Sequence, residues 1–173
     1  MKVLVVSDVH TNLSPLLTVL GKLSDLDGSV FLGDGYDLAV PLLRRRLPFC
    51  YAVQGNVDGY GYGDEDGGQL VKIEGLRIFL THGHKEQVKF GYQRVVYAAQ
   101  EQEANLCLFG HTHLSALFYE QGIMFLNPGS IGHPRLDGVP SLALLDFVAG
   151  EAHPTLLGII DGVIQPLPPA MYR

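Results

Sequence analysis

The sequence has few cysteines and no long hydrophobic run. Cys50 and Cys107 are the only cysteines among 173 residues, and they lie far apart inside apolar segments. Because no Cys-x-x-Cys pair occurs, we expect neither a thiolate metal site nor a disulfide framework, and both side chains should be buried. No segment approaches the roughly 18 apolar residues of a membrane helix, and the first residues lead into a strand instead of a signal peptide. The sequence therefore predicts a cytoplasmic protein with no membrane partner.

Positive charge is scarce as well. The chain has 12 lysines and arginines against 18 aspartates and glutamates, a formal net charge of −6. This acidic balance argues against nucleic acid as a partner. The one basic cluster, Arg44–Arg46, is expected at a solvated helix end, with a phosphate-binding patch as the alternative. At this length we expect a single domain, residues 1–173, with a substantial core.

Apolar runs alternate with helical patterns in the first third of the chain. Three strands with two helices between them are predicted over residues 2–54. The first helix should have Ser14 as its N-cap and Pro15 at its first position, and the second, near 36–47, must start or bend at Pro41. This order predicts parallel strands joined by right-handed crossovers.

The later pattern is different. A hairpin is predicted over residues 69–81 and the longest helix over 86–104. Short strands joined by turns follow from residue 105 and predict antiparallel pairing, whereas the prolines within 165–173 should end the fold. Two mixed sheets packed face to face with helices outside, a four-layer α/β/β/α sandwich of the α/β (α+β) class, would accommodate both patterns.

A short polar cluster follows each of five predicted strands. Buried strands that end in Asp, Asn and His place several metal-binding side chains at one edge of a sheet. All the ligand atoms are oxygen or imidazole nitrogen, which indicates a metal site other than a structural thiolate site. The clusters are Asp8-Val9-His10, Gly33-Asp34, Gly55-Asn56, His82-Gly83-His84 and Gly110-His111-Thr112-His113.

These side chains suit a pair of cations. The two oxygens of the Asp34 carboxylate can bridge two cations, and His111 and His113, two residues apart, should point in different directions. Two cations about 3.5–4 Å apart can hold a bridging hydroxide and clamp a phosphoryl group for in-line attack. Each cluster alone could be a turn or a chance pair, but five in order, each at the end of a strand, predict a metal site.

As a set, these motifs resemble those of the calcineurin-like metallophosphoesterase superfamily. The chain is similar to the small single-domain prokaryotic phosphodiesterases, a branch that also includes the retromer small subunit of eukaryotic vacuolar sorting. The family fold is the same four-layer sandwich. The resemblance spans residues 1 to about 145 and rests on Asp8-x-His10, Gly33-Asp34-x-x-Asp37, Gly55-Asn56-x-Asp58, His82-Gly83-His84, Gly110-His111-Thr112-His113 and Asn127-Pro128-Gly129-Ser130.

The resemblance implies a function and a set of roles. It implies a phosphoesterase, most often a phosphodiesterase, that uses two divalent metal ions chosen from manganese, iron, nickel and zinc. The alternative is a metal-binding scaffold for protein contacts with little catalysis, as in the retromer small subunit. The implied ligands are Asp8, His10 and His113 for the first metal, Asn56, His82 and His111 for the second, and Asp34 between them.

The sequence departs from the wider superfamily at one position. Many members have a histidine directly after the Asn of the third motif, where it is thought to protonate the leaving group, but this chain has Val57. Asp58 or His84 could supply the proton instead, or a metal-bound water could, or the leaving group could depart without help. His84 could equally be a hydrogen-bonding partner within the loop.

Other polar residues of the motifs should support the site. Asp37 is expected as a helix N-cap or as a partner of a ligand. Asn127 and Ser130 could orient ligating histidines, although the segment that contains them is also a competent turn. Arg135 could meet a substrate phosphate or lie on the surface. Exposed strand edges in the second half would suit a homodimer.

Overall fold

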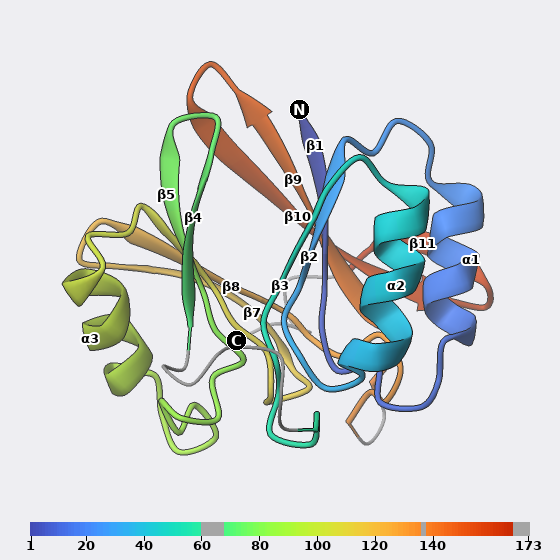
Figure 1. The fold of residues 1–173 in the computed structure, drawn as a ribbon, viewed down its shortest axis with the longest axis horizontal. Coiled ribbons are helices and arrows are strands. Elements are labelled where there is room, and N and C mark those ends of the chain that lie inside the picture. Colours follow the sequence, from blue (N-terminus) through green and yellow to red (C-terminus); the bar gives the residue numbers. More distant parts are fainter. Residues whose placement is uncertain (60–67, 136–137, 168–173) are drawn as a thin grey trace.

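Two β-sheets lie face to face between helices. The computed structural model describes residues 1–59, 68–135 and 138–167. One sheet has six strands in the order β11-β10-β9-β1-β2-β3, and the other has five in the order β4-β5-β6-β8-β7. Helices α1 and α2 cover the outer face of the first sheet and α3 covers the outer face of the second, so the predicted four-layer sandwich of two mixed sheets is confirmed (Figure 1).

The helices and strands have the following bounds. The helices are α1 (Ser14–Lys22), α2 (Tyr36–Arg46) and α3 (Gln93–Glu101). The strands of the six-stranded sheet are β1 (Lys2–Val6), β2 (Gly28–Phe31), β3 (Cys50–Ala52), β9 (Ser141–Val148), β10 (Glu151–Ile160) and β11 (Val163–Pro166). Those of the five-stranded sheet are β4 (Gln69–Ile73), β5 (Leu76–Leu80), β6 (Leu106–Leu108), β7 (Ser115–Glu120) and β8 (Ile123–Pro128).

Strand β1 shows why the central strands are continuously apolar. Successive side chains of a strand point to opposite faces of the sheet. Val3 and Val5 enter the core between the two sheets, whereas Leu4 and Val6 enter the core under α1 and α2. Because both faces are covered, the strand carries no polar alternation. It pairs in parallel with β2 and antiparallel with β9.

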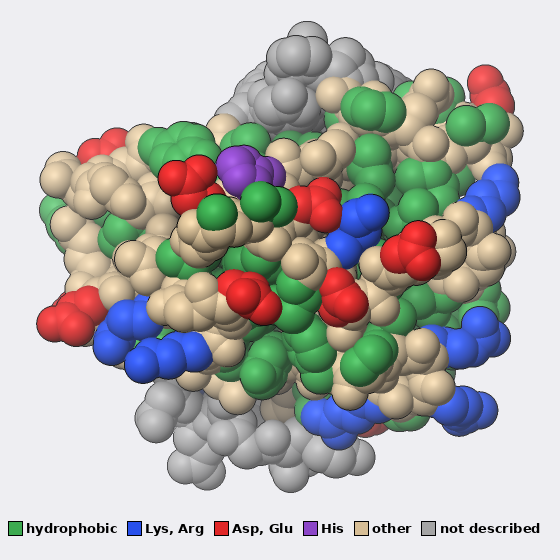
Figure 2. Space-filling model, turned by 90° about the horizontal axis from the view of Figure 1, so that it is seen from above, with side chains coloured by type: hydrophobic (Ala, Val, Ile, Leu, Met, Phe, Trp, Pro, Cys, Tyr) green, Lys and Arg blue, Asp and Glu red, His purple; other side chains and the backbone are tan. Residues whose placement is uncertain are grey.

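The carboxyl ends of β1, β2, β3, β5 and β6 lead into loops at one end of the molecule, the lower edge in Figure 1. The five predicted ligand clusters lie in these loops. The opposite end, seen in Figure 2, carries intermixed hydrophobic, acidic and basic side chains over the described residues.

The N-cap prediction for the first helix is wrong, whereas the second helix begins where the pattern predicts. Helix α1 begins at Ser14, so Leu13 occupies the N-cap position, and the Ser14 N–H donates to the Asn12 side-chain oxygen at 3.2 Å. Helix α2 begins well before Pro41, which lies inside it. An acceptor outside the helix satisfies its first amide, because the Tyr36 N–H donates to Asp58 Oδ1 at 2.9 Å.

Two further predictions are wrong in extent. Residues 85–90 form turns, and only Gln93–Glu101 is helical within the predicted 86–104. Gly91, with φ of 141°, holds a backbone conformation that a helix cannot contain. At the other end, the chain does not leave the fold at residue 165, because β11 adds an edge strand with Pro166 as its last residue, where a proline is tolerated. Residues 168–173 lie outside the described residues.

Candidate metal centre

The loops after β1, β2 and β6 bring one group of four candidate ligands together. Asp8, His10, Asp34 and His113 each offer an atom within 4.8 Å of the others. His113 Nε2 lies 3.2 Å from His10 Nε2 and 3.1 Å from Asp8 Oδ1, and His10 Nε2 lies 3.8 Å from Asp34 Oδ2. This arrangement of two carboxylates around two imidazoles can surround one cation.

A second group shares Asp34 with the first. It contains Asp34, His82 and His111, again with ligand atoms within 4.8 Å of one another. His82 Nε2 lies 3.4 Å from Asp34 Oδ2 and 3.1 Å from His111 Nδ1. Asn56 follows β3 in the adjacent turn, and its side chain is exposed. Six of the seven predicted ligands therefore fall into two groups with one common member, and the predicted role of Asn56 stays a prediction.

Asp34 presents the same oxygen to both groups. Its Oδ1 accepts the Val57 N–H at 3.1 Å, which leaves Oδ2 facing both His10 and His82. Asp34 would therefore offer Oδ2 to a cation held by either group, while the backbone holds Oδ1. Burial raises the pKa of Asp34, but the hydrogen bond and charge of His82 outweigh burial and bring the pKa down to about 2. The carboxylate is therefore ionised at neutral pH.

Backbone carbonyls hold two of the histidine rings. Nδ1–H of His82 donates to the carbonyl oxygen of Leu32 at 2.6 Å, and Nδ1–H of His113 donates to that of His133 at 2.6 Å. Each bond holds the ring so that Nε2 faces the carboxylates, where a neutral ring would offer its lone pair to a cation; metal-binding histidines receive this support in proteins. The sequence gives no sign of these bonds, because every residue has a carbonyl.

The donor set fits divalent cations. Asp8 is completely buried: its Oδ2 accepts the His111 N–H at 3.1 Å, and its Oδ1 faces His113 Nε2 at 3.1 Å. A buried carboxylate is costly unless it is paired, and a cation held between Asp8 Oδ1 and a neutral His113 ring would satisfy both atoms. Burial, followed by the charge of His82, lowers the pKa of His111 to about 4, so that ring is neutral at pH 7. Oxygen and imidazole donors without thiolate suit manganese, iron, nickel or zinc.

The ligands share an uncommon backbone conformation. A positive φ is rare outside glycine and costs about 1–3 kcal/mol when the surrounding structure enforces it. Such residues gather at functional sites, where they aim side chains that regular structure cannot aim. Five predicted ligands have a positive φ: Asp8 (55°), His10 (50°), Asp34 (62°), His111 (68°) and His113 (60°).

Asp58 fastens the Asp34 loop to the turn after β3. Its Oδ2 accepts the N–H groups of Asp34 and Gly55, both at 2.8 Å. Its Oδ1 accepts those of Gly35 at 2.7 Å and Tyr36 at 2.9 Å. Four backbone donors thus occupy both carboxylate oxygens. The two loops approach so closely that a Cβ at Gly55 would collide with the Asp34 carboxylate.

Asn127 and Ser130 brace the other ligand loops. The buried Asn127 amide donates to the Gly110 carbonyl at 2.9 Å and to Thr112 Oγ1 at 3.0 Å, which supports the loop of His111 and His113. Ser130 Oγ donates to the Asp8 carbonyl at 2.8 Å and accepts the His133 N–H at 2.8 Å.

The remaining candidates lie around the centre. Asp37 is exposed in the first turn of α2, where Gly35 is the N-cap residue, and Arg135 is exposed beside His113. The His84 ring lies 5.4 Å from that of His82 and 6.1 Å from that of His111, with its buried Nδ1 unpartnered among the described residues. Val57, at the position of the missing histidine, is 60% exposed.

The chain is similar to several known proteins. Residues 1–150 match the family described as the calcineurin-like phosphoesterase superfamily domain. The chain belongs to this superfamily. It is 33% identical over 150 residues to the probable metallophosphoesterase YsnB of Bacillus subtilis, covering 84% of this chain and 83% of that protein.

Two other similarities concern a curated phosphodiesterase and a solved structure. The chain is 35% identical over 78 residues to the phosphodiesterase YfcE of Escherichia coli, covering 45% of this chain and 39% of that protein. A structure of Vps29 from Entamoeba histolytica, a single mutant, has the same fold, with a TM-score of 0.80 and 23% identity over 95% of this chain and 96% of that one. Within the described residues, no helix is long and apolar enough to cross a membrane.

Proposed function

We propose that the chain hydrolyses phosphate esters, phosphodiesters in particular, with two divalent cations. The observation that carries this proposal is Asp34 Oδ2, one ionised oxygen that faces both groups of ligands. Membership of a metallophosphoesterase superfamily and similarity to a protein named as a phosphodiesterase support it.

The ligand sets of the proposal follow the two groups. Asp8, His10 and His113 would hold one cation, His82 and His111 would hold the other with the Asn56 side-chain oxygen, and Asp34 would be shared. When bound, such a pair of cations supplies a water of lowered pKa and positive charge beside the phosphoryl oxygens. The buried carboxylates and the carbonyl-held rings keep the donor atoms in place before substrate arrives.

The supporting residues take different roles in this proposal. Asp58 positions Asp34, because all four of its bonds go to backbone amides and leave no oxygen directed at a substrate. His84 contacts a phosphate oxygen. Burial, followed by the charge of His82, lowers the pKa of His84, so its neutral ring can donate a hydrogen bond but is a poor proton source at pH 7. Leaving groups of low pKa would therefore react fastest.

Hydrolysis of bis-p-nitrophenyl phosphate in the presence of Mn²⁺, Zn²⁺ or Ni²⁺ tests the proposal. Asp34→Asn should abolish turnover and lower the metal content measured by mass spectrometry. Asp161→Asn is a matched control, since Asp161 also has a positive φ, 51°, and lies in the exposed turn between β10 and β11 (Figure 1). Firm uptake of metal without turnover by any metal would refute the enzyme and favour the scaffold function.

A further inference from the structure

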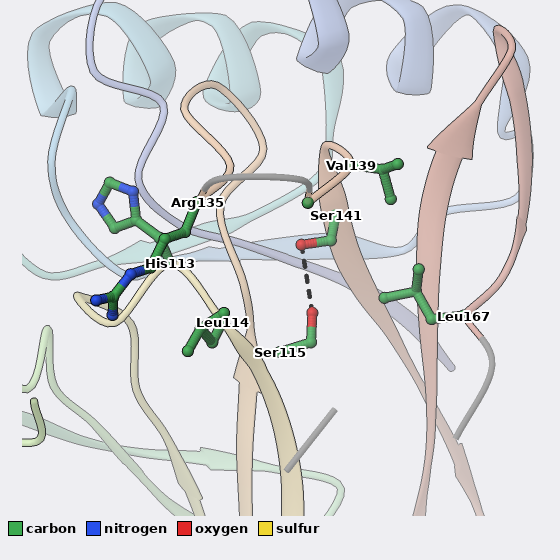
Figure 3. Close-up of a pocket in the computed structure, with 8 residues that line it drawn as sticks. His113, Leu114, Ser115, Arg135, Val139, Ser141 and Leu167 are labelled. Atoms are coloured by element: carbon green, nitrogen blue, oxygen red, sulfur yellow. Dashed lines mark hydrogen bonds between the residues drawn. The ribbon is translucent and has the colours of Figure 1, made fainter. Parts of the chain in front are cut away.

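A small pocket lies beside the metal centre on the side of His113. Its volume is about 120 Å³, and His113 and Arg135 form its boundary toward the centre. In Figure 3 the side chains of these two residues leave the pocket on the same side, away from Ser141 and Leu167. The pocket and the candidate centre therefore share His113 as a common wall, with one cationic side chain next to it.

The lining of the pocket is mainly apolar with a polar floor. Leu114, Val139 and Leu167 supply the apolar walls. Ser115 and Ser141 supply hydroxyls whose oxygens lie 3.3 Å apart, drawn as the dashed line in Figure 3. A cavity of about 150 Å³ is enough to hold benzene, so this pocket has room for part or all of one small ring. An uncharged ring with a polar substituent matches the walls and the floor together.

The pocket floor is joined to the ligand loops. The Ser141 N–H donates to the Ser130 carbonyl at 3.0 Å, and Ser130 Oγ in turn donates to the Asp8 carbonyl. Ser115 follows His113 by two residues and its hydroxyl donates to the Pro128 carbonyl at 3.2 Å. The pocket therefore keeps a fixed place relative to the centre.

In-line displacement determines which part of a diester could reach this pocket. The attacking and leaving groups lie opposite each other on phosphorus, and the remaining three substituents spread sideways. Two of these substituents are non-bridging oxygens, and in a diester the third is the ester oxygen of the arm that stays on the phosphate. The pocket borders His113, one of the proposed ligands, so a sideways substituent that passes His113 and Arg135 would reach it.

We propose that this pocket binds the retained arm of a phosphodiester, an uncharged ring-sized group, and that Arg135 faces the phosphate beside it. The inference rests on the proposed phosphodiesterase function and names the class of substrate for that site. A monoester or a diester with a methyl arm would leave the pocket empty, so the chain should prefer diesters whose retained arm contains a ring.

Filling the pocket tests the proposal by kinetics. Val139→Phe places a ring in the pocket, and Val148→Phe, at the exposed far end of β9, is the matched control. Phenyl p-nitrophenyl phosphate and methyl p-nitrophenyl phosphate have the same leaving group and charge and differ in the arm. Val139→Phe should lower kcat/KM for the phenyl ester roughly tenfold or more and leave the methyl ester within twofold of the wild type. An equal effect on both esters, or on neither, would overturn the proposal.

A binding measurement separates this proposal from the hydrolytic function. In the metal-free protein, diphenyl phosphate should shift the backbone amide NMR signals of Val139 and Ser141, and dimethyl phosphate should not. The shifts should disappear in Val139→Phe and persist in Val148→Phe. If both probes shift the same signals, or neither shifts those of the pocket, the pocket does not recognise the arm. A wild type that binds diphenyl phosphate there and hydrolyses no ester would refute the proposed function alone.

Discussion

Replacing Asp58 by Asn should loosen the metal centre without removing a ligand. The substitution keeps the shape of the side chain, removes its negative charge and turns one accepting oxygen into an NH₂ group. Two of the four backbone amides, those of Asp34 and Gly55 or those of Gly35 and Tyr36, would then face a donor instead of an acceptor. The Asp34 loop would lose part of the contact that holds its left-handed backbone.

The four bonds allow the expected loss to be estimated. Hydrogen bonds to a charged group contribute about 1.5–3 kcal/mol each, so two lost bonds correspond to about 3–6 kcal/mol. Asp58 is only half-buried, and water can replace part of each bond, which places the expected loss near the lower end, about 3 kcal/mol. Because the free energy of unfolding of a domain is about 5–15 kcal/mol, the variant should still fold.

Urea unfolding followed by circular dichroism measures this loss, and titration with Mn²⁺ measures the effect on the centre. Asp37→Asn is the control. Asp37 is exposed in the first turn of α2, and its substitution removes the same charge near the same helix end. The control should lose at most about 1 kcal/mol. The reasoning is refuted if Asp58→Asn is no less stable than Asp37→Asn and binds Mn²⁺ as tightly as the wild type.

Three further outcomes are expected. Val57→His adds a proton donor at the exposed position next to Asn56, and kcat should rise about tenfold or more for phenyl esters while changing little for p-nitrophenyl esters. The pKa of His111 is about 6.5 in the unfolded chain and about 4 in the folded protein. The metal-free protein should therefore lose stability as the pH falls from 6.5 to 4, because the unfolded chain binds the proton more readily. His111→Gln should lessen that loss in urea titrations. Mn²⁺ at 100 times its Kd should stabilise the wild type by about 2.7 kcal/mol in a thermal melt, and Asp34→Asn by much less.

Each of these outcomes has a contrary result. If Val57→His raised kcat equally for phenyl and p-nitrophenyl esters, the new histidine would not act by donating a proton to the leaving group. Burial lowers the pKa of His82 and of His113, but their acidic neighbours raise it by more. Both pKa values are therefore raised, and these rings favour the folded state at low pH. Their contribution to stability is lost as the pH rises through the raised pKa, and it is the same in the wild type and in His111→Gln. If the stability of His111→Gln changes with pH as steeply as that of the wild type, the effect does not come from His111. Equal stabilisation of wild type and Asp34→Asn would place Mn²⁺ elsewhere.

The sequence predicts the positions of the ligand loops because apolar periodicity and chain order determine sheet layers. A run such as Val3 to Val6 must be buried on both faces, and parallel strands bring their carboxyl ends to one edge. Asp8 and His10 after one strand and Asp34 after the next are therefore neighbours in any such fold. This rule accounts for Asp8, His10 and Asp34. His82, His111 and His113 follow strands of the second sheet, and they reach the same edge because the two sheets pack face to face.

Contacts made by the backbone could not be predicted in the same way. The carbonyls of Leu32 and His133 orient two rings, yet a carbonyl leaves no trace in residue identity. Asp58 was open to interpretation as an acid because its residue type fits both proton transfer and amide binding. The helix predicted over 86–104 is too long, since its apolar pattern continues across Gly91 although the backbone does not.

The positive φ values at the ligands affect which residues would remain at these positions in related proteins that no longer bind metal. Aspartate, asparagine and glycine tolerate this backbone better than most residues, and alanine adds a strain of about 1–2 kcal/mol to the loss of a ligand. Selection for folding alone would then keep Asp or Asn at positions 8 and 34 after the metals were no longer needed. Histidine also tolerates this backbone, so a preserved residue at 8, 10, 34, 111 or 113 is weak evidence of a working centre. His82, which is not among the described residues with a positive φ, carries the distinction.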